Sequence, residues 1–159
     1  MRNETLSPRP RVQRDRRFVI GIDPDLSKSG VGIVRDGKLV DMLALNFPLL
    51  LRMVSECLDS QPLIILEDVE TDSTTYHRAK TNHRQHARIA QNVGQVKGVK
   101  RVLVECLEDM GATVVQVKPM RGGVKGRAKT DADFFNRITG WEGRTNEDKR
   151  DAAMLALWA

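Results

Sequence analysis

The chain has 159 residues, of which 40% are hydrophobic and 30% charged, and its formal net charge is +5. This length predicts one domain with a core of its own, and the lack of a run of about 18 apolar residues excludes a membrane span. Cys57 and Cys106 form no CxxC pair, and no apolar segment follows the basic N-terminus as a secretory signal requires. We therefore expect reduced thiols and a cytoplasmic protein.

Positive charge is concentrated in three segments, residues 1–17, 71–101 and 118–129. They hold six, seven and five Lys or Arg residues against two, one and no acids. Together they exceed the net charge of the whole chain, so the remainder is acidic. Cations that bind phosphates around carboxylates that bind a metal are typical of a nucleic-acid enzyme. Solvated charge without a partner is the alternative.

The first expected element is a buried strand over residues 18–22, which ends at Asp23. Residues 1–16, with two prolines and five arginines, predict a basic flexible arm, and residues 17–159 a single domain. A turn leads from Asp23 to a second strand over residues 31–34. An unpaired buried carboxylate costs several kcal/mol, on the order of 2–7 or more. Asp23 therefore needs a partner, which could be a base, a backbone cap or a metal ion.

A tight-turn pair, Asp36 and Gly37, predicts a third strand that ends near residue 45, so the first three strands form an antiparallel meander. Residues 47–60 predict a helix, because their apolar positions recur at helical spacing. Residues 63–66 predict a fourth strand whose apolar residues are continuous rather than alternating. That pattern is typical of a central strand buried on both faces, and it is followed directly by acids, of which Glu67 is the first.

A long helix is expected over residues 86–110, after a polar and basic loop over residues 71–86. Gly94 and Gly98 each cost about 1 kcal/mol relative to Ala inside a helix, so we expect them to allow close approach of another backbone. That backbone could belong to the sheet or to a second copy of the helix. A glycine at 111 caps the helix, and a fifth strand follows over residues 113–117.

The last third of the chain predicts two helices. Residues 118–129 are rich in glycine and basic residues, and we expect a mobile loop there. A helix should begin near residue 129 or 130 and end before Gly140. Asn146 or Thr145 should cap the last helix, whose apolar residues predict tight packing on the core.

This order of elements predicts an α/β fold. Right-handed crossovers place the fourth strand beside the first and the fifth outside it. The prediction is a mixed five-stranded sheet of order 3-2-1-4-5, flanked by helices. Asp23 and Glu67 then follow adjacent parallel strands at their carboxyl ends, where ligands bind in such sheets.

Two further acids, Asp148 and Asp151, share one face at the start of the last helix. If that helix lies across the sheet, four carboxylates converge and raise one another's pKa. Hard divalent cations such as Mg²⁺ relieve this repulsion, and two ions about 3.5–4 Å apart can catalyse phosphodiester cleavage. Each acid alone could instead be a turn or helix-capping residue.

The chain resembles the RuvC-type Holliday junction resolvases, which have the RNase H-like fold. The resemblance is carried, in order, by GIDPDLSKSGVGIV, LIILEDVE, VGQVKGV, RAKTDADFFNRITG and DKRDAAMLALWA, and it spans residues 18–159. Two departures stand out. Asp25 replaces the glycine usual in the family, and Glu70 lies where the family tends to carry an aromatic or apolar residue, which leaves Tyr76 as the nearest aromatic.

The resemblance implies a homodimer that nicks four-way DNA junctions symmetrically in the cytoplasm of a bacterium or a phage-infected host. It implies two Mg²⁺ or Mn²⁺ ions per active site, no organic cofactor and no membrane partner. The metal ligands carried over by position are Asp23, Glu67, Asp148 and Asp151, with Lys129 as a basic residue beside them.

Phosphate contacts are expected from the basic segments, at Arg78, Lys80, Arg84, Arg88, Lys118, Arg121, Lys125, Arg127 and Lys129, with Tyr76 near the DNA. The resemblance places Val93, Gly94, Val96 and Gly98 in the dimer interface. Two other functions stay open. One is an RNase H-like nuclease acting on RNA–DNA hybrid or structured RNA, and the other is a non-catalytic nucleic-acid-binding module.

Overall fold

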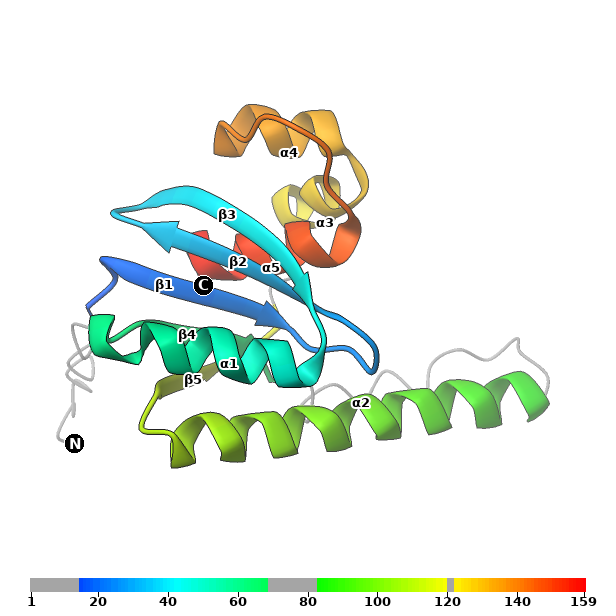
Figure 1. Cartoon of the computed structure of the whole chain (residues 1–159). Coiled ribbons are helices and arrows are strands. Elements are labelled where there is room, and N and C mark those ends of the chain that lie inside the picture. Colours follow the sequence, from blue (N-terminus) through cyan, green and yellow to red (C-terminus); the bar gives the residue numbers. More distant parts are fainter. Residues whose placement is uncertain (1–14, 69–82, 120–121) are drawn as a thin grey trace, which may run out of the picture.

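The computed structural model describes residues 15–68, 83–119 and 122–159, and Figure 1 shows a twisted sheet between layers of helices. The elements in chain order are β1 (Phe18–Asp23), β2 (Ser29–Arg35), β3 (Lys38–Leu45), α1 (Phe47–Cys57), a 3₁₀ turn (Leu58–Ser60), β4 (Leu63–Glu67), α2 (His83–Asp109), β5 (Thr113–Val117), α3 (Gly123–Thr130), α4 (Ala132–Thr139) and α5 (Glu147–Trp158).

The sheet has the predicted order, β3-β2-β1-β4-β5. β1 pairs antiparallel with β2, and β2 with β3, while β1 and β4, and β4 and β5, pair parallel. Asp36 and Gly37 form the tight turn between β2 and β3, with φ of 48° and 78°. The predicted α/β fold class is confirmed.

Both faces of the sheet are buried, as the continuous apolar sequence of β4 predicts. Ile64 and Leu66 face α1 and α2, and pack with Leu103 and Leu107 of α2. Leu63 and Ile65 face the other side and pack against Leu155 of α5. α1 and α2 therefore cover one face of the sheet and α5 the other (Figure 1).

α5 lies almost directly on the backbones of β1 and β2, because both strands present glycine to it. A Cβ atom on Gly21 would overlap the carbonyl oxygen of Ala152, and one on Gly32 would lie 2.5 Å from the Cα atom of Ala153. A Cβ atom on Gly30 would overlap the carbonyl group of Asp148. Three glycines thus set how closely α5, which carries two of the predicted site acids, approaches the sheet.

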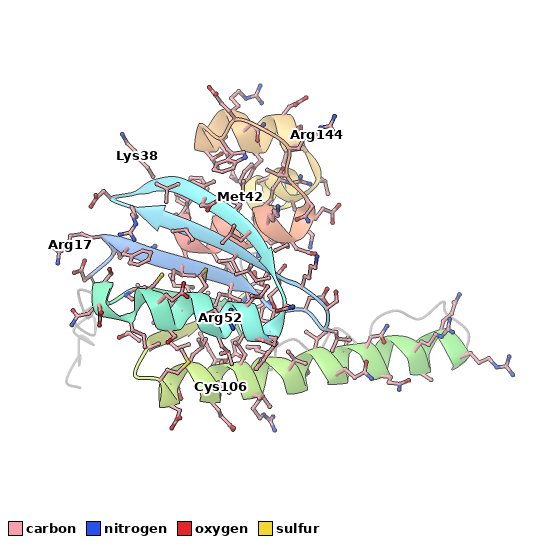
Figure 2. The ribbon with its side chains drawn as sticks, in the orientation of Figure 1. Arg17, Lys38, Met42, Arg52, Cys106 and Arg144 are labelled. Atoms are coloured by element: carbon pink, nitrogen blue, oxygen red, sulfur yellow. The ribbon has the colours of Figure 1, made fainter. Side chains whose placement is uncertain are left out.

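The segment 118–129 differs from the prediction of a mobile loop, because most of it is the helix α3. Ala128 of α3 is fully buried with Phe135 of α4 and with Ala153 and Met154 of α5, and Met42, labelled on β3 in Figure 2, belongs to the same cluster. Tertiary packing on this apolar residue outweighs the low helix propensity of the glycines. Asp131, which accepts a hydrogen bond from the backbone N–H of Phe134, then starts a separate helix, α4.

The remaining boundaries lie close to the predicted ones. α2 begins three residues earlier than expected, at His83, and residues 69–82, with most of the predicted loop, lie outside the described residues. Asn146 is the cap of α5, since its side chain accepts from the backbone N–H of Lys149. Within the described residues, no helix combines the length and apolar character needed to cross a bilayer.

Residues 1–14 of the predicted arm also lie outside the described residues. Its last residue, Arg16, is attached to the domain. Its guanidinium donates to the carbonyl oxygens of Ala159 at 2.7 Å and Ala156 at 3.3 Å. These carbonyls belong to the carboxyl end of α5, which a cation stabilises.

Candidate active site

Asp23 and Glu67 lie at the carboxyl ends of two adjacent parallel strands. Ile22 of β1 pairs with Leu66 of β4 in parallel register, so the next residue on each strand is an acid. Asp23 is opposite Gly30 on its other side. The parallel pairing predicted from the crossovers therefore brings these two acids to the same edge of the sheet.

Asp148 and Asp151 reach this edge on the first turns of α5. Asp148 lies above Gly30, where the helix touches β2 most closely, and its side chain is exposed. Asp151 is only 8% exposed. The glycines of β1 and β2 thus bring the second pair of acids to the first pair, a role that the sequence analysis did not assign to them.

Burial and the surrounding acids raise the pKa of Asp23 to about 7. Burial is the largest cause, and the negative charges of Asp151, Asp148 and Glu67 add to it, while Lys129 opposes it. The other three predicted acids thus lie within electrostatic reach of Asp23. Asp25 is exposed, and its carboxylate is used inside the turn, where it accepts from the backbone N–H of Leu26 at 2.7 Å.

Two lysines of α3 neutralise part of this acidic edge. Lys125 forms an ion pair with Glu67, and Lys129 Nζ lies 2.9 Å from Asp151 Oδ2. The hydrogen bond to Asp151 is the main cause of a raised pKa for Lys129. Lys125 was predicted as a phosphate contact, and nothing in the sequence pattern paired it with Glu67. The pairing depends on the unexpected helix α3, which turns Lys125 toward β4.

The donor chemistry of the site fits a hard divalent cation. All four acids offer carboxylate oxygens, which Mg²⁺ and Mn²⁺ prefer. Asp151 Oδ1 is buried without a hydrogen-bond partner in the described structure, and such an atom costs free energy unless a cation or water satisfies it. No three carboxylate, imidazole or thiol side chains in the described part of the chain already surround one point closely enough to chelate an ion.

A cavity of about 360 Å³ opens beside two of these acids, Glu67 and Asp151. It lies between the carboxyl ends of β4 and β5, α3 and α5, and is lined by Glu67, Pro119, Gly122, Lys125, Gly126, Lys129 and Asp151. Two glycines of its wall leave room that larger side chains would fill. An extended phosphodiester strand could therefore approach the acids from this side.

The other predicted phosphate contacts fall into three groups. Lys118, Arg84 and Arg88 are exposed, the last two on the part of α2 that runs past the sheet (Figure 1). Arg127 is exposed but already engaged, because its guanidinium lies 4.2 Å from the Phe134 ring centroid and 3.6 Å from Asp131 Oδ2. The predicted DNA contacts Tyr76, Arg78, Lys80 and Arg121 lie outside the described residues. Glu70, one of the two departures from the family, lies outside them as well.

The glycines of α2 do not approach the sheet. A Cβ atom on Gly94 or Gly98 would meet nothing within 4 Å, so close contact with the sheet, one of the two predicted uses, is wrong for the described structure. Val93 and Val96 beside them are half-buried. The predicted contact with a second copy of the helix stays a prediction.

The raised pKa of Asp23 predicts how stability without added metal depends on pH. Between pH 4 and pH 7 the unfolded chain releases the Asp23 proton while the folded protein keeps it, so the free energy of unfolding falls as pH rises. The loss is at most about 4 kcal/mol for a shift of this size. We expect Asp23→Asn to be more stable than the wild type at pH 8, with the difference vanishing near pH 4, as measured by urea unfolding in the presence of a chelator. A difference independent of pH would contradict the assigned environment of Asp23.

No protein-family model matches the chain, and no curated protein matches its sequence. The fold is similar to that of Thermus thermophilus RuvC in complex with Holliday junction substrate, with a TM-score of 0.55 and 20% sequence identity over 88% of this chain and 90% of that one. A second Thermus thermophilus RuvC structure gives a TM-score of 0.52 and 19% identity over 88% of this chain and 91% of that one.

The likeness covers 88% of this chain, and the order of strands in the sheet is the one predicted for the RNase H-like fold. The chain therefore has the fold of the RuvC structures, with a five-stranded mixed sheet whose carboxyl edge collects Asp23, Glu67, Asp148 and Asp151.

Proposed function

We propose that this protein is a metal-dependent endonuclease that resolves Holliday junctions and other branched DNA by paired symmetric nicks. The observation that carries the proposal is the set of three acids around Asp23, with the raised pKa of Asp23 and the buried unpartnered oxygen of Asp151. The RuvC-like fold supports it, since one structure of that fold holds a Holliday junction substrate.

Asp23, Glu67, Asp148 and Asp151 are the residues that would hold Mg²⁺ or Mn²⁺. Two ions there would supply Lewis-acid activation of water and stabilisation of the leaving oxygen, which leaves a 5′-phosphate and a 3′-hydroxyl. Asp23 ends the strand next to β4, and the charges of the other three acids all act on it, so it would be the central ligand of the set. Lys129 and Lys125, which neutralise the carboxylates, also border the cavity through which phosphate would approach.

Binding of the junction rests on the exposed basic side chains around this cavity and on α2. Lys118 and Arg127 are the chain neighbours of Pro119 and Gly126, which line the cavity, while Arg84 and Arg88 lie near the amino end of α2. Such contacts hold phosphates without reading sequence, so affinity should fall steeply with salt. Paired nicking also needs two sites, which a two-fold dimer through α2 would supply.

The decisive experiment is cleavage of a synthetic mobile four-way junction in Mg²⁺ and in Mn²⁺, with products mapped on all four strands. The proposal expects nicks on two strands of like polarity, at symmetric positions. An RNA–DNA hybrid duplex is the comparison substrate. Faster cleavage of the hybrid would favour an RNase H-like activity, and salt-sensitive binding without any cleavage would favour a non-catalytic module.

The dimer is tested by a bulky substitution on the exposed glycine face of α2. We expect Gly94→Leu to raise the dissociation constant of the dimer at least about ten-fold, because a side chain there would separate two closely packed helices. Light scattering over a range of micromolar concentrations measures this. Asn92→Leu is the matched control, since Asn92 is exposed on nearly the opposite side of the same turn. A wild type that stays monomeric with and without junction DNA would contradict paired nicking.

A further inference from the structure

Arg150 is a buried cation whose guanidinium hydrogen-bonds to none of the four acids of the site. Arg150 lies in α5, two residues after Asp148 and directly before Asp151, and is only 5% exposed. Burying a guanidinium costs free energy unless its N–H groups are satisfied. The groups that accept hydrogen bonds from Arg150 are therefore held in place by it.

The partners of Arg150 lie in α3 and in the loop before α5. Its Nε and Nη2 donate to the carbonyl oxygen of Lys129, at 2.9 and 2.5 Å. Its Nη1 donates to Thr145 Oγ1 at 2.8 Å. The guanidinium thus joins the carboxyl end of α3 to the loop that leads into α5.

The carbonyl group of Lys129 belongs to the last turn of α3, where carbonyl oxygens have no partner inside the helix and carry partial negative charge. A two-pronged contact from one guanidinium fixes both the position and the direction of this carbonyl. Arg150 therefore ends α3 in a defined geometry at the very residue whose side chain enters the acidic site.

Lys129 needs such a hold, because its side chain is not held by burial. The side chain of Lys129 is 45% exposed, whereas that of its partner Asp151 is 11% exposed. Two successive residues of α5 contact Lys129, since Arg150 binds its backbone carbonyl and Asp151 binds its ammonium group. α5 thereby holds both the backbone and the side-chain end of Lys129.

We propose that Arg150 is a positioning residue, which holds the backbone of Lys129 so that the Lys129 ammonium group stays in the acidic site beside Asp151. The inference rests on the proposed function for its effect on cleavage, though not for its effect on Lys129 itself. The Arg150 side chain hydrogen-bonds to none of the four acids and does not line the cavity.

Four variants test the inference in the full-length protein: Arg150→Met, Lys129→Met, their combination, and Arg52→Met as a control for the loss of one arginine. Arg52 is exposed on α1, in the helix layer on the far side of the sheet from α5 (Figure 2). The readouts are the single-turnover cleavage rate at saturating junction, the junction dissociation constant and the thermal unfolding midpoint.

We expect Arg150→Met to slow cleavage at least about ten-fold while changing the junction dissociation constant less than about two-fold, and Arg52→Met to change neither. In the Lys129→Met background, Arg150→Met should slow cleavage by less than about two-fold, because the residue through which it acts is already gone. The same fold-loss in both backgrounds would overturn the inference.

A second measurement does not depend on cleavage. An ammonium group whose protons are protected by a hydrogen bond gives a ¹H–¹⁵N signal in cold solution, and Lys129→Met identifies the signal of Lys129. Arg150→Met, or the gentler Thr145→Val and Arg150→Lys if the first fails to fold, should remove or broaden this signal. An unchanged Lys129 signal in a folded Arg150 variant would overturn the inference. A wild type that cuts no branched DNA would refute the proposed function and leave this measurement decisive.

Discussion

Asp23→Asn is expected to slow junction cleavage at least about a thousand-fold while leaving junction binding intact. The charges of the other three acids all raise the pKa of Asp23, which places it at the centre of the set. Asparagine keeps the shape of the side chain but is a weaker, uncharged metal ligand. Removing one negative charge next to a bound phosphate should not weaken binding. Single-turnover rates in Mg²⁺ and gel-shift titration without metal measure the two effects separately.

Asp59→Asn is the matched control for this result. Asp59 is an exposed acid in the 3₁₀ turn before β4, at the amino end of that strand and thus at the opposite edge of the sheet. The Asp59→Asn variant should cleave the junction at the wild-type rate. If Asp23→Asn also cut at the wild-type rate in Mg²⁺, the four acids would not be the catalytic centre, whatever the substrate.

The second large effect is on folding, and concerns a glycine rather than an acid. Gly21→Ala should lower the free energy of unfolding by about 3 kcal/mol or more, because the added methyl group would overlap the backbone of α5 at Ala152. Backbone cannot move aside as a side chain can, so the whole helix must shift. For a domain of marginal stability, about 5–15 kcal/mol in total, this is a large fraction. Urea unfolding measures it.

Gly123→Ala makes the same chemical change where there is room. Gly123 lies in the first turn of α3, and an added Cβ atom would meet nothing within 4 Å. We expect its stability to match or exceed that of the wild type by up to about 1 kcal/mol. Equal stability of Gly21→Ala and the wild type would mean that α5 does not rest on β1 as closely as described.

The sheet could be predicted from the sequence because each of its features has a local signal. The apolar runs and turns between residues 18 and 45 indicate a meander, and the continuous apolar run before Glu67 indicates a central strand. The handedness of crossovers then leaves one arrangement that brings Asp23 next to Glu67. These steps use only short stretches of chain and a rule of chirality.

What could not be predicted depends on contacts between distant segments. The glycines of residues 118–129 indicated a loop, yet burial of Ala128 between α4 and α5 makes a helix of it. The pairing of Lys125 with Glu67 and the grip of Arg150 on Lys129 both follow from that helix. Gly21, Gly30 and Gly32 carried a signal that could have been used, since three glycines on two apolar strands suggest a closely packed partner.

The close seating of α5 on these glycines also limits how such a site can change. Asp148 and Asp151 belong to a helix that rests on main chain, so the separation of the two pairs of acids is fixed by backbone contact rather than by side-chain volume. Most protein cores can be adjusted one methyl group at a time. Here one methyl group is already too large a step, so the spacing of the acids is closed to gradual adjustment and can vary only through a concerted movement of the whole helix.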